Sequence, residues 1–295
     1  MSDYILSCES ALDLTAEHAA RRNLSYLPFS FELDGHTYRD DLWQTMPSEA
    51  FYQAMEKGAE TRTSQINAAE YEEYFSRFLK EGKDVLHLCL SSGITGTVNS
   101  ALLAAEGLRE SYPERKIYVV DSLAMCGGLG LLMDALADLR DGGMELKELV
   151  RWIEANKLRV HHWFFSTDLT YYIRGGRISK AAGTFGGLLG ICPLLNVGAD
   201  GQLVPREKIR SKKKVIQALA EKMALYAENG ADYDQNCYLR HSACEEDARQ
   251  VAELVEARFP KLKKRVEIGS IGPTIGSHTG PGTVALFFWG SPRID

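Results

Sequence analysis

Residues 84–120, DVLHLCLSSGITGTVNSALLAAEGLRESYPERKIYVV, have the pattern of a strand, a helix and a second strand in succession. The mostly apolar residues 84–90 and the apolar residues 117–120 predict two buried strands, and residues 97–111 between them predict a helix. Buried strands that alternate with helices are typical of a parallel sheet with helices on both faces. This stretch therefore predicts a doubly wound α/β fold.

The sequence on either side of this stretch continues the alternation. Asn67 and Glu70 have the spacing of a capping box, which predicts the start of a helix. Asp34-Gly35 is a hairpin signal, and the small polar residues 61–65 predict a loop. Further strands and helices are expected at residues 4–8, 24–33, 47–57, 122–139 and 146–153. We expect residues 1–158 to form one α/β domain around a parallel sheet.

The pattern changes after residue 158. Residues 191–197 and 202–209 predict two strands joined by a turn at Asp200-Gly201, so this half contains an antiparallel hairpin. Residues 276–282 predict a glycine-rich loop around His278. Other strands are expected at residues 160–165, 237–240, 265–268 and 283–289, and helices at 211–228 and 245–258. We expect residues 159–295 to form a second, mixed α+β domain.

The composition argues against several classes of protein. The 34 basic and 40 acidic residues leave a net charge of −6, which is not typical of a general nucleic-acid binder. No apolar run reaches the ~20 residues that span a bilayer, and the first residues lack the pattern of a signal peptide. The six cysteines are scattered without zinc spacing. These features predict a cytoplasmic protein with reduced thiols and no metal site.

Nucleotide-binding motifs are also missing from the sequence. No G-x-x-x-x-G-K-[ST] is present, and no G-x-G-x-x-G follows a predicted strand. We therefore expect no cofactor, and no use of ATP or NAD by this chain alone.

Three separate loops combine small hydroxyl residues with glycines: Thr63-Ser64-Gln65, Ser91-Ser92-Gly93, and residues 276–282 around His278. The second loop lies where a strand meets the N-terminus of a helix, and free backbone N–H groups there favour an anion. Arg177 and Arg210 offer guanidinium groups. Each loop alone is ordinary turn chemistry, but together they predict a composite anion site.

His278 has two alternative roles in such a site. It could act as a general base with Ser92 as nucleophile, which would make the protein a serine hydrolase. The sequence has no G-x-S-x-G elbow and no evident acidic residue to orient the histidine. The alternative, a hydrogen bond from His278 to a bound carboxylate, is the interpretation that the sequence favours.

The stretch from 171 to 195, YYIRGGRISKAAGTFGGLLGICPLL, is unusually rich in glycine for an apolar segment. Such a segment either leaves room for a ligand or is a glycine-rich helix that crosses a sheet. The residues alone leave both interpretations open.

Six motifs, in this order, resemble those of the DegV family of bacterial fatty-acid-binding proteins. They span nearly the whole chain and are Thr63-Ser64-Gln65, SSGITGT (91–97), VVDS (119–122), GGRISKAAGTFGGLLGICPLL (175–195), VPREKIRSKKK (204–214) and IGPTIGSHTGPG (271–282). The chain departs from the family pattern at Cys8-Glu9-Ser10, Thr95 and Cys192. These departures leave open which acyl chain the protein prefers and how it would dock to the kinase that serves members of this family.

The resemblance implies a two-domain α/β protein that holds one long-chain fatty acid between its domains. It also implies which residues bind the carboxylate, namely Thr63, Ser64, Ser92, Gly93 and His278, with Arg177 and Arg210 as the family's two arginines. Well-understood members serve a separate ATP-dependent fatty acid kinase, which converts the bound acid to an acyl phosphate for phospholipid metabolism. The chain would then be a carrier subunit and not an enzyme.

The acyl chain of such a ligand should lie against apolar residues. We expect these to be Ile94, Phe185, Leu188, Leu189 and Ile191, unless they form ordinary core. A serine hydrolase that uses Ser92 and His278, and a lipid sensor without a kinase, remain as alternatives.

Overall fold

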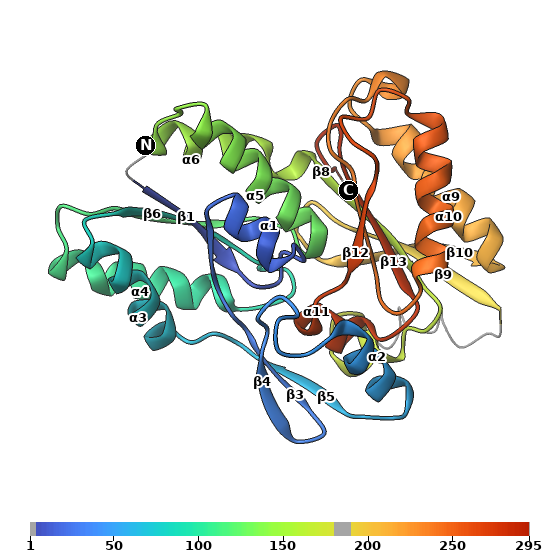
Figure 1. Ribbon diagram of the computed structural model, residues 1–295, viewed down its shortest axis with the longest axis horizontal. Helices are drawn as coiled ribbons and strands as arrows, with labels where there is room; N and C mark the ends of the chain where they lie inside the picture. The colour runs from blue at the N-terminus through green and yellow to red at the C-terminus, as the bar shows by residue number, and fades with distance from the viewer. Residues whose placement is uncertain (1–3, 180–189, 295) are drawn as a thin grey trace.

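The computed structural model describes residues 4–179 and 190–294. A four-stranded sheet in the order β2-β1-β6-β7 lies at one side of the molecule, and all of its strand pairs are parallel (Figure 1). Its strands are β1 (Tyr4–Glu9), β2 (Leu24–Leu27), β6 (Asp84–Cys89) and β7 (Ile117–Asp121). The predicted parallel sheet is therefore confirmed.

Helices cover both faces of this sheet, as the alternating pattern predicts. In Figure 1, α3 and α4 lie below the sheet, and α1, α5 and α6 lie above it. The Asn67 side chain accepts from the Glu70 N–H and the Glu70 carboxylate accepts from the Asn67 N–H, both at 3.0 Å, so the predicted capping box is confirmed. The helices are α1 (Ala16–Arg21), α3 (Ala68–Lys80), α4 (Thr97–Ser111), α5 (Cys126–Asp141) and α6 (Leu146–Asn156).

The later part of the chain forms a six-stranded sheet in the order β10-β9-β8-β13-β11-β12. Only the pair β11–β12 is parallel, and the predicted hairpin is the antiparallel pair β9–β10. The strands are β8 (Val160–Ser166), β9 (Ile191–Val197), β10 (Leu203–Arg210), β11 (Tyr238–His241), β12 (Glu267–Ser270) and β13 (Thr283–Trp289). Among the described residues, the helices of this part are α7 (Thr170–Arg174), α9 (Lys212–Tyr226), α10 (Glu245–Arg258) and α11 (Pro273–Thr279), with short 3₁₀ turns at Lys157–Arg159 and Gly230–Asp232.

A third sheet, in the order β4-β3-β5, corrects one prediction. Residues 61–65 were expected to form a loop, but Thr61–Ser64 is strand β5 and pairs antiparallel with β3. Its partner lies some thirty positions earlier in the chain, so local polarity gave no signal. The other elements here are β3 (Ser30–Leu33), β4 (His36–Arg39) and α2 (Ser48–Glu56). The turn between β3 and β4 is the predicted Asp34-Gly35 hairpin.

The predicted loop at residues 276–282 is also partly wrong. Residues 273–279 form α11, and His278 lies in its last turn. Pro273 occupies the first turn, where its fixed φ suits a helix and its missing N–H costs nothing.

Helix α5 packs against both large sheets. It contacts β1 of the parallel sheet and β8, β11 and β13 of the six-stranded sheet, and one continuous hydrophobic core joins all of these elements. A Cβ atom on Gly128 would lie 2.0 Å from His162 Nε2, so only glycine allows this close approach. The predicted division at residue 158 stays a prediction.

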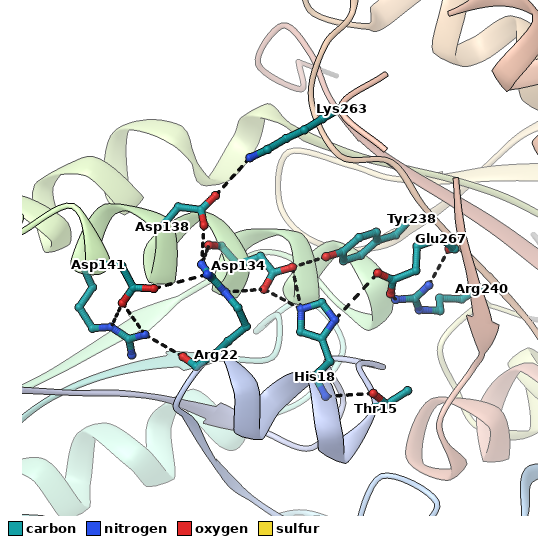
Figure 2. A network of polar contacts seen from close by, with 11 residues as sticks. Thr15, His18, Arg22, Asp134, Asp138, Asp141, Tyr238, Arg240, Lys263 and Glu267 are labelled. Atoms are coloured by element: carbon teal, nitrogen blue, oxygen red, sulfur yellow. Dashed lines mark hydrogen bonds and ion pairs between the residues drawn. The ribbon is translucent and has the colours of Figure 1, made fainter. Parts of the chain in front are cut away.

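A buried polar network also ties α1 and α5 to the six-stranded sheet (Figure 2). His18 Nε2 lies 2.9 Å from Asp134 Oδ1, and the Tyr238 hydroxyl donates to the same carboxylate. Burial alone would raise the pKa of Asp134, but the hydrogen bonds from His18 and Tyr238 hold it below its ordinary value. Arg240 donates to Glu267 at 2.7 Å beside this group. Charged side chains thus reinforce the contact that α5 makes with apolar ones.

No helix within residues 4–179 and 190–294 is long and apolar enough to cross a membrane.

Candidate functional site

A narrow cavity lies between the end of β6 and the inner face of the six-stranded sheet. About 100 Å³ of it is open to the centres of water-sized spheres, several times the 10–15 Å³ that one water needs. Most of its wall is apolar and includes Phe29, Leu90, Ile94, Met125, Phe164, Val197, Leu203, Ile275, Ala285 and Phe287. We call this cavity the channel.

The strand pair β8–β13 gives the channel its direction. Alternate residues of a strand face the same side, and Thr283, Ala285 and Phe287 of β13 all line the channel. Thr283 to Phe287 spans about 13 Å at ~3.3 Å per residue. His162 lies opposite Phe287 in the sheet and lines the far end. The channel is therefore long in one direction and apolar along most of its length.

Polar side chains from three elements meet at the near end, beside the start of β13. Thr63 and Ser64 come from β5, His278 from α11, and Arg177 from the turn after α7. Thr63 Oγ1 lies 2.8 Å from His278 Nε2, and Arg177 Nη1 lies 3.3 Å from His278 Nδ1. His278 is thus held between an arginine and a hydroxyl.

These contacts determine which atoms of the polar end can donate. Arginine only donates, so His278 Nδ1 must accept, and the proton of the neutral ring lies on Nε2. That N–H then donates to Thr63 Oγ1. Burial, together with the charge of Arg177, lowers the pKa of His278 to about 3, so the ring is neutral near pH 7. The Thr63 hydroxyl keeps its own hydrogen for a ligand in the channel.

Arg177 supplies the positive charge of the polar end. Burial lowers the pKa of its guanidinium somewhat from an ordinary value of 12.5, so the group stays charged near neutral pH. Its Nη1 also donates to the carbonyl oxygen of Gly175 at 2.5 Å, which fixes the side chain. Because His278 is neutral, Arg177 is the group that can compensate the charge of a bound carboxylate.

The structure brings together some of the site residues that the sequence suggested. Thr63, Ser64, His278 and Arg177 line the polar end, and Ile94 lines the channel. Phe185, Leu188 and Leu189 lie outside the described residues.

Ser92, Gly93, Arg210 and Ile191 are not among the residues that line the channel. The Ser-Ser-Gly turn instead packs on the β9–β10 turn, where Ser91 Oγ donates to the Gly201 carbonyl at 2.9 Å. Ser92 is exposed, and Arg210 lies on the exposed end of β10. The roles of these four residues stay predictions.

The positions of Ser92 and His278 also bear on the alternative that the protein is a serine hydrolase. The two ring nitrogens of His278 contact Thr63 and Arg177. Ser92 is exposed and its backbone N–H donates to Asp121 at 3.1 Å. The described geometry therefore does not form a Ser92–His278 pair.

Several lining residues were missed by the sequence reasoning. Gln65, Tyr172 and Thr279 lie near the polar end, and His162 and Phe287 close the far end. Gln65 belongs to a motif already noted, so the sequence held a signal for it. His162 and Phe287 become neighbours only through the register of β8 and β13, which no local pattern reveals.

Within the described residues, one group of three side chains lies close enough to share a metal ion: Glu9, His87 and Cys89. All three are buried, and Glu9 already accepts from Tyr71, from the Leu90 N–H and from His87. Burial also raises the pKa of the Cys89 thiol well above its ordinary value, which opposes the thiolate that binds metals. The group is therefore arranged as a satisfied hydrogen-bond network of the core.

A family model described as "Uncharacterised protein, DegV family" matches residues 7–290. The chain belongs to the DegV family. A DegV domain-containing protein of Clostridium perfringens is 35% identical to it over 293 residues, which is 99% of each chain.

Two solved structures share the DegV fold with this chain. A DegV family protein from Thermus thermophilus, described for its fatty acid binding, is 26% identical with a TM-score of 0.85, over 98% of this chain and 99% of that one. The Fatty Acid Kinase B3 protein of Streptococcus pneumoniae, solved loaded with linoleic acid, is 22% identical with a TM-score of 0.83, over 100% of both chains. At 22% identity, the similarity to the pneumococcal protein shows a shared fold and no more. The predicted α/β and mixed architecture is thus confirmed, and DegV-fold proteins of known structure bind fatty acids.

Proposed function

We propose that this protein binds one long-chain fatty acid and presents its carboxylate to a separate ATP-dependent fatty acid kinase. The acyl chain occupies the channel, and the carboxylate meets Thr63, Ser64 and Arg177 at the polar end. The observation that carries the proposal is an apolar channel closed at one end by a hydroxyl donor and a guanidinium. The fatty acid binding described for the Thermus thermophilus relative supports it.

The physical chemistry of a fatty acid fits this arrangement. Its carboxylate is ionised near neutral pH, so it needs hydrogen-bond donors and a positive charge, which Thr63 and Arg177 provide. A 16-carbon acid buries about 15 carbons at ~0.8 kcal/mol each, or roughly 12 kcal/mol before the costs of binding. A charge-assisted hydrogen bond adds about 1.5–3 kcal/mol. The tail thus supplies most of the affinity, and the polar end sets where the head lies.

The kinase belongs to the proposal because the motifs of this chain resemble those of a family whose well-understood members serve a separate ATP-dependent kinase. The missing phosphate-binding loop motif is consistent with a partner that supplies ATP. The fold shared with the pneumococcal fatty acid kinase protein is consistent with this role.

Native mass spectrometry of the purified protein, followed by solvent extraction, tests the binding step. We expect one long-chain acid per chain. A ligand-free mass that stays unchanged after incubation with fatty acids would contradict the proposal.

A second experiment separates a carrier from a lipid sensor and from a hydrolase. The loaded protein is mixed with ATP and the fatty acid kinase of its own host, and acyl phosphate is measured. Acid binding without acyl phosphate formation would favour the sensor. Ester hydrolysis that Ser92→Ala abolishes would favour the hydrolase.

A further inference from the structure

Strand β12 lies at one end of the six-stranded sheet, and its outer edge has no neighbouring strand among the described residues. On the inner side, the Glu267 N–H donates to the Cys237 carbonyl at 3.1 Å, next to β11. Because alternate residues of a parallel strand bond to the same neighbour, the backbone N–H and C=O groups of Ile268 and Ser270 point outward. No backbone partner for these groups is found in the part of the chain that the structure describes. The edge of β12 is therefore open to pairing.

The other edge of the same sheet, β10, is protected in ways that proteins commonly use. It contains Pro205, a shift of register just after this proline, and the charged side chains of Arg206, Lys208 and Arg210. Strand β12 is short, but Glu267–Ser270 includes no proline, no lysine and no shift of register. A sheet that is protected at one edge and open at the other favours a binding role for the open edge.

A hollow lies on each face of β12, and residues Ile268–Ser270 line both hollows. Arg240 lines one and His241 the other, and these adjacent residues of β11 point to opposite faces. By the same measure as the channel, the hollow beside α1 has about 370 Å³ and the hollow beside α2 about 530 Å³. We call them the α1 hollow and the α2 hollow. A strand added to β12 would direct its side chains alternately into the two.

The α2 hollow is acidic. Glu49, Glu56 and Glu245 line it together with one arginine, Arg249. Arg249 forms an ion pair with Glu245. Glu49 and Glu56 are exposed and have no ion-pair partner within the described residues. Two negative charges are thus left for a basic ligand.

His241 also lines the α2 hollow, and only 8% of this residue is exposed. Its Nδ1 atom has no hydrogen-bond partner in the described part of the chain. Buried polar atoms without a partner are rare in proteins. Burial also lowers the pKa of His241, so the ring is neutral near pH 7 and does not offset the charge of the glutamates. The wall of the α2 hollow therefore keeps both an unpaired polar atom and an unpaired negative charge.

The α1 hollow differs from the α2 hollow in its chemistry. Arg240 donates to Glu267 at 2.7 Å within it, which neutralises one charge of each sign. Leu14, Leu42 and Trp43 give it an apolar part. It therefore suits small or apolar side chains better than a row of like charges.

We propose that the outer edge of β12 binds an extended, basic segment of a partner protein as a seventh strand of the sheet. The main chain of the segment pairs with Ile268 and Ser270. Lysine or arginine side chains at every second position lie in the α2 hollow beside Glu49 and Glu56, and the residues between them face the α1 hollow. Main-chain bonds supply affinity in this kind of binding, and the hollows supply the preference for alternating basic residues.

The charge of the α2 hollow favours this occupant over a second copy of the chain. Two β12 edges that paired with each other would bring two acidic hollows together, and like charges across an interface are unfavourable. The inference is also independent of the proposed fatty acid binding, because no residue of β12 lines the channel.

The first test measures binding of a fluorescent peptide, acetyl-TVKVKVKT-amide, by anisotropy at low salt. We expect the wild type to bind it, and to bind the charge-reversed peptide acetyl-TVEVEVET-amide about tenfold more weakly or not at all. In Glu49→Gln/Glu56→Gln, affinity for the basic peptide should fall about fivefold. This loss should shrink as salt rises, because both glutamates are exposed.

The control variant is Glu110→Gln/Glu114→Gln. It removes the same charge from two exposed glutamates that line neither hollow. We expect it to bind the basic peptide as the wild type does.

Ile268→Pro tests the main-chain pairing. The Ile268 N–H points outward, so proline keeps the bonds to β11, and edge strands tolerate proline at such positions. We expect peptide affinity to fall about tenfold through the lost bond and the bulk of the ring, whereas Ile268→Val should bind like the wild type. Amide hydrogen exchange checks the same contact without a substitution, because the peptide should slow exchange at Ile268 and Ser270 of the wild type.

Four results would overturn the inference. One is a wild type that does not bind the basic peptide, and another is a control variant that loses as much affinity as Glu49→Gln/Glu56→Gln. Binding that survives Ile268→Pro and leaves exchange at Ile268 and Ser270 unchanged would show attraction of charges without strand pairing. A wild-type dimer that Ile268→Pro dissociates would assign the edge to a second copy of the chain.

Discussion

Arg177, His278 and Thr63 fix one another's hydrogen-bond roles at the polar end of the channel. Arg177 donates to Nδ1, so Nε2 carries the proton and donates to Thr63. In the complex that we propose, Thr63 is then the donor to the carboxylate, and His278 acts through it as a positioning residue. The direct hydrogen bond from His278 to a carboxylate, which the sequence favours, stays a prediction.

Replacing Thr63 tests this order of donors. Thr63→Val keeps the shape but removes the hydroxyl, and we expect fatty acid affinity to fall about tenfold, because one hydrogen bond to a charged group is lost. Thr63→Ser keeps the hydroxyl and should bind nearly as well as wild type. Isothermal titration with palmitate measures both, and equal affinities for the serine and valine variants would contradict the role of the hydroxyl.

Arg177 should also determine how binding depends on pH. In the wild type, His278 stays neutral because its pKa is lowered to about 3, so affinity should not change between pH 7 and 5 through this group. Arg177→Gln removes one cause of that lowering, and the pKa of His278 rises. We expect about tenfold weaker binding at pH 7. Burial, the larger cause of the lowered pKa, remains in this variant, so recovery through a protonated imidazole begins only below about pH 5. A recovery that is already complete at pH 6 would contradict this account.

Among the secondary-structure elements, α11 connects the polar end to two buried carboxylates. Asp13 accepts from the Gly272 N–H at 3.0 Å, and Asp40 accepts from the Thr274 hydroxyl at 2.5 Å. Burial raises the pKa of Asp13 to about 6 and that of Asp40 to about 7. Asp40 Oδ1 has no hydrogen-bond partner among the residues that the structure describes. The start of the helix that carries His278 is therefore attached to carboxyl groups that burial disfavours as anions.

The raised pKa of Asp40 should make the free energy of unfolding fall as pH rises. Because its pKa is raised from 3.8 in the unfolded chain to about 7 in the folded one, the folded state binds more protons within this window. The free energy of unfolding then falls with increasing pH, by at most about 1.4 kcal/mol per pH unit for this group. We expect Asp40→Asn to gain stability relative to wild type between pH 5 and 8 in urea unfolding.

The difference between variant and wild type is the quantity to compare, because buried histidines act in the opposite direction. Burial lowers the pKa of His161 to about 4, which favours folding as pH rises. An Asp40→Asn difference that does not change with pH would contradict the raised pKa.

The close approach of α5 to the six-stranded sheet depends on Gly128. In Gly128→Ala, the new methyl group would meet His162, and we expect a loss of about 1–3 kcal/mol in unfolding free energy. Gly107 of α4 is a matched control, because a Cβ atom there would meet only a flexible Glu72 oxygen at 3.3 Å. Gly107→Ala should stabilise by about 0.5–1 kcal/mol, as alanine does inside a helix. Similar urea midpoints for the two variants would show that the contact is unimportant.

Across the whole molecule, the length of the channel should select the length of the acid. Ala285 lies midway along β13, and Phe287 lies at the far end. Ala285→Phe should block the channel and shift the bound acids toward shorter chains, whereas Phe287→Ala should shift them toward longer ones. Both shifts are measured by mass spectrometry of the lipids extracted from each purified variant, with all cells grown in the same batch of medium. A shift in the same direction for both variants would contradict the direction assigned to the channel.

The sequence predicted those parts of the fold that depend on local patterns. The strand–helix–strand unit around SSGITGT, the capping box at Asn67 and the β9–β10 hairpin each arise from neighbouring residues. Strand β5 and the register that places His162 opposite Phe287 arise from distant partners. The hydrogen bond from Ser91 to the Gly201 carbonyl joins residues 110 positions apart, and Ser92 beside it is exposed. Sequence reasoning therefore found the motifs of the site but not which of them share a space.

Helix α5 is common to the cores of both large sheets, and this restricts how a ligand can exchange. A clamshell opening of the two sheets would pull α5 from one of them, exposing apolar surface and breaking the His18–Asp134–Tyr238 contacts. Separating the two sheets in this way would cost a free energy comparable to that of unfolding part of the core. If the protein binds a long-chain acid as we propose, exchange without such an opening should make its release slow enough for the loaded protein to survive purification.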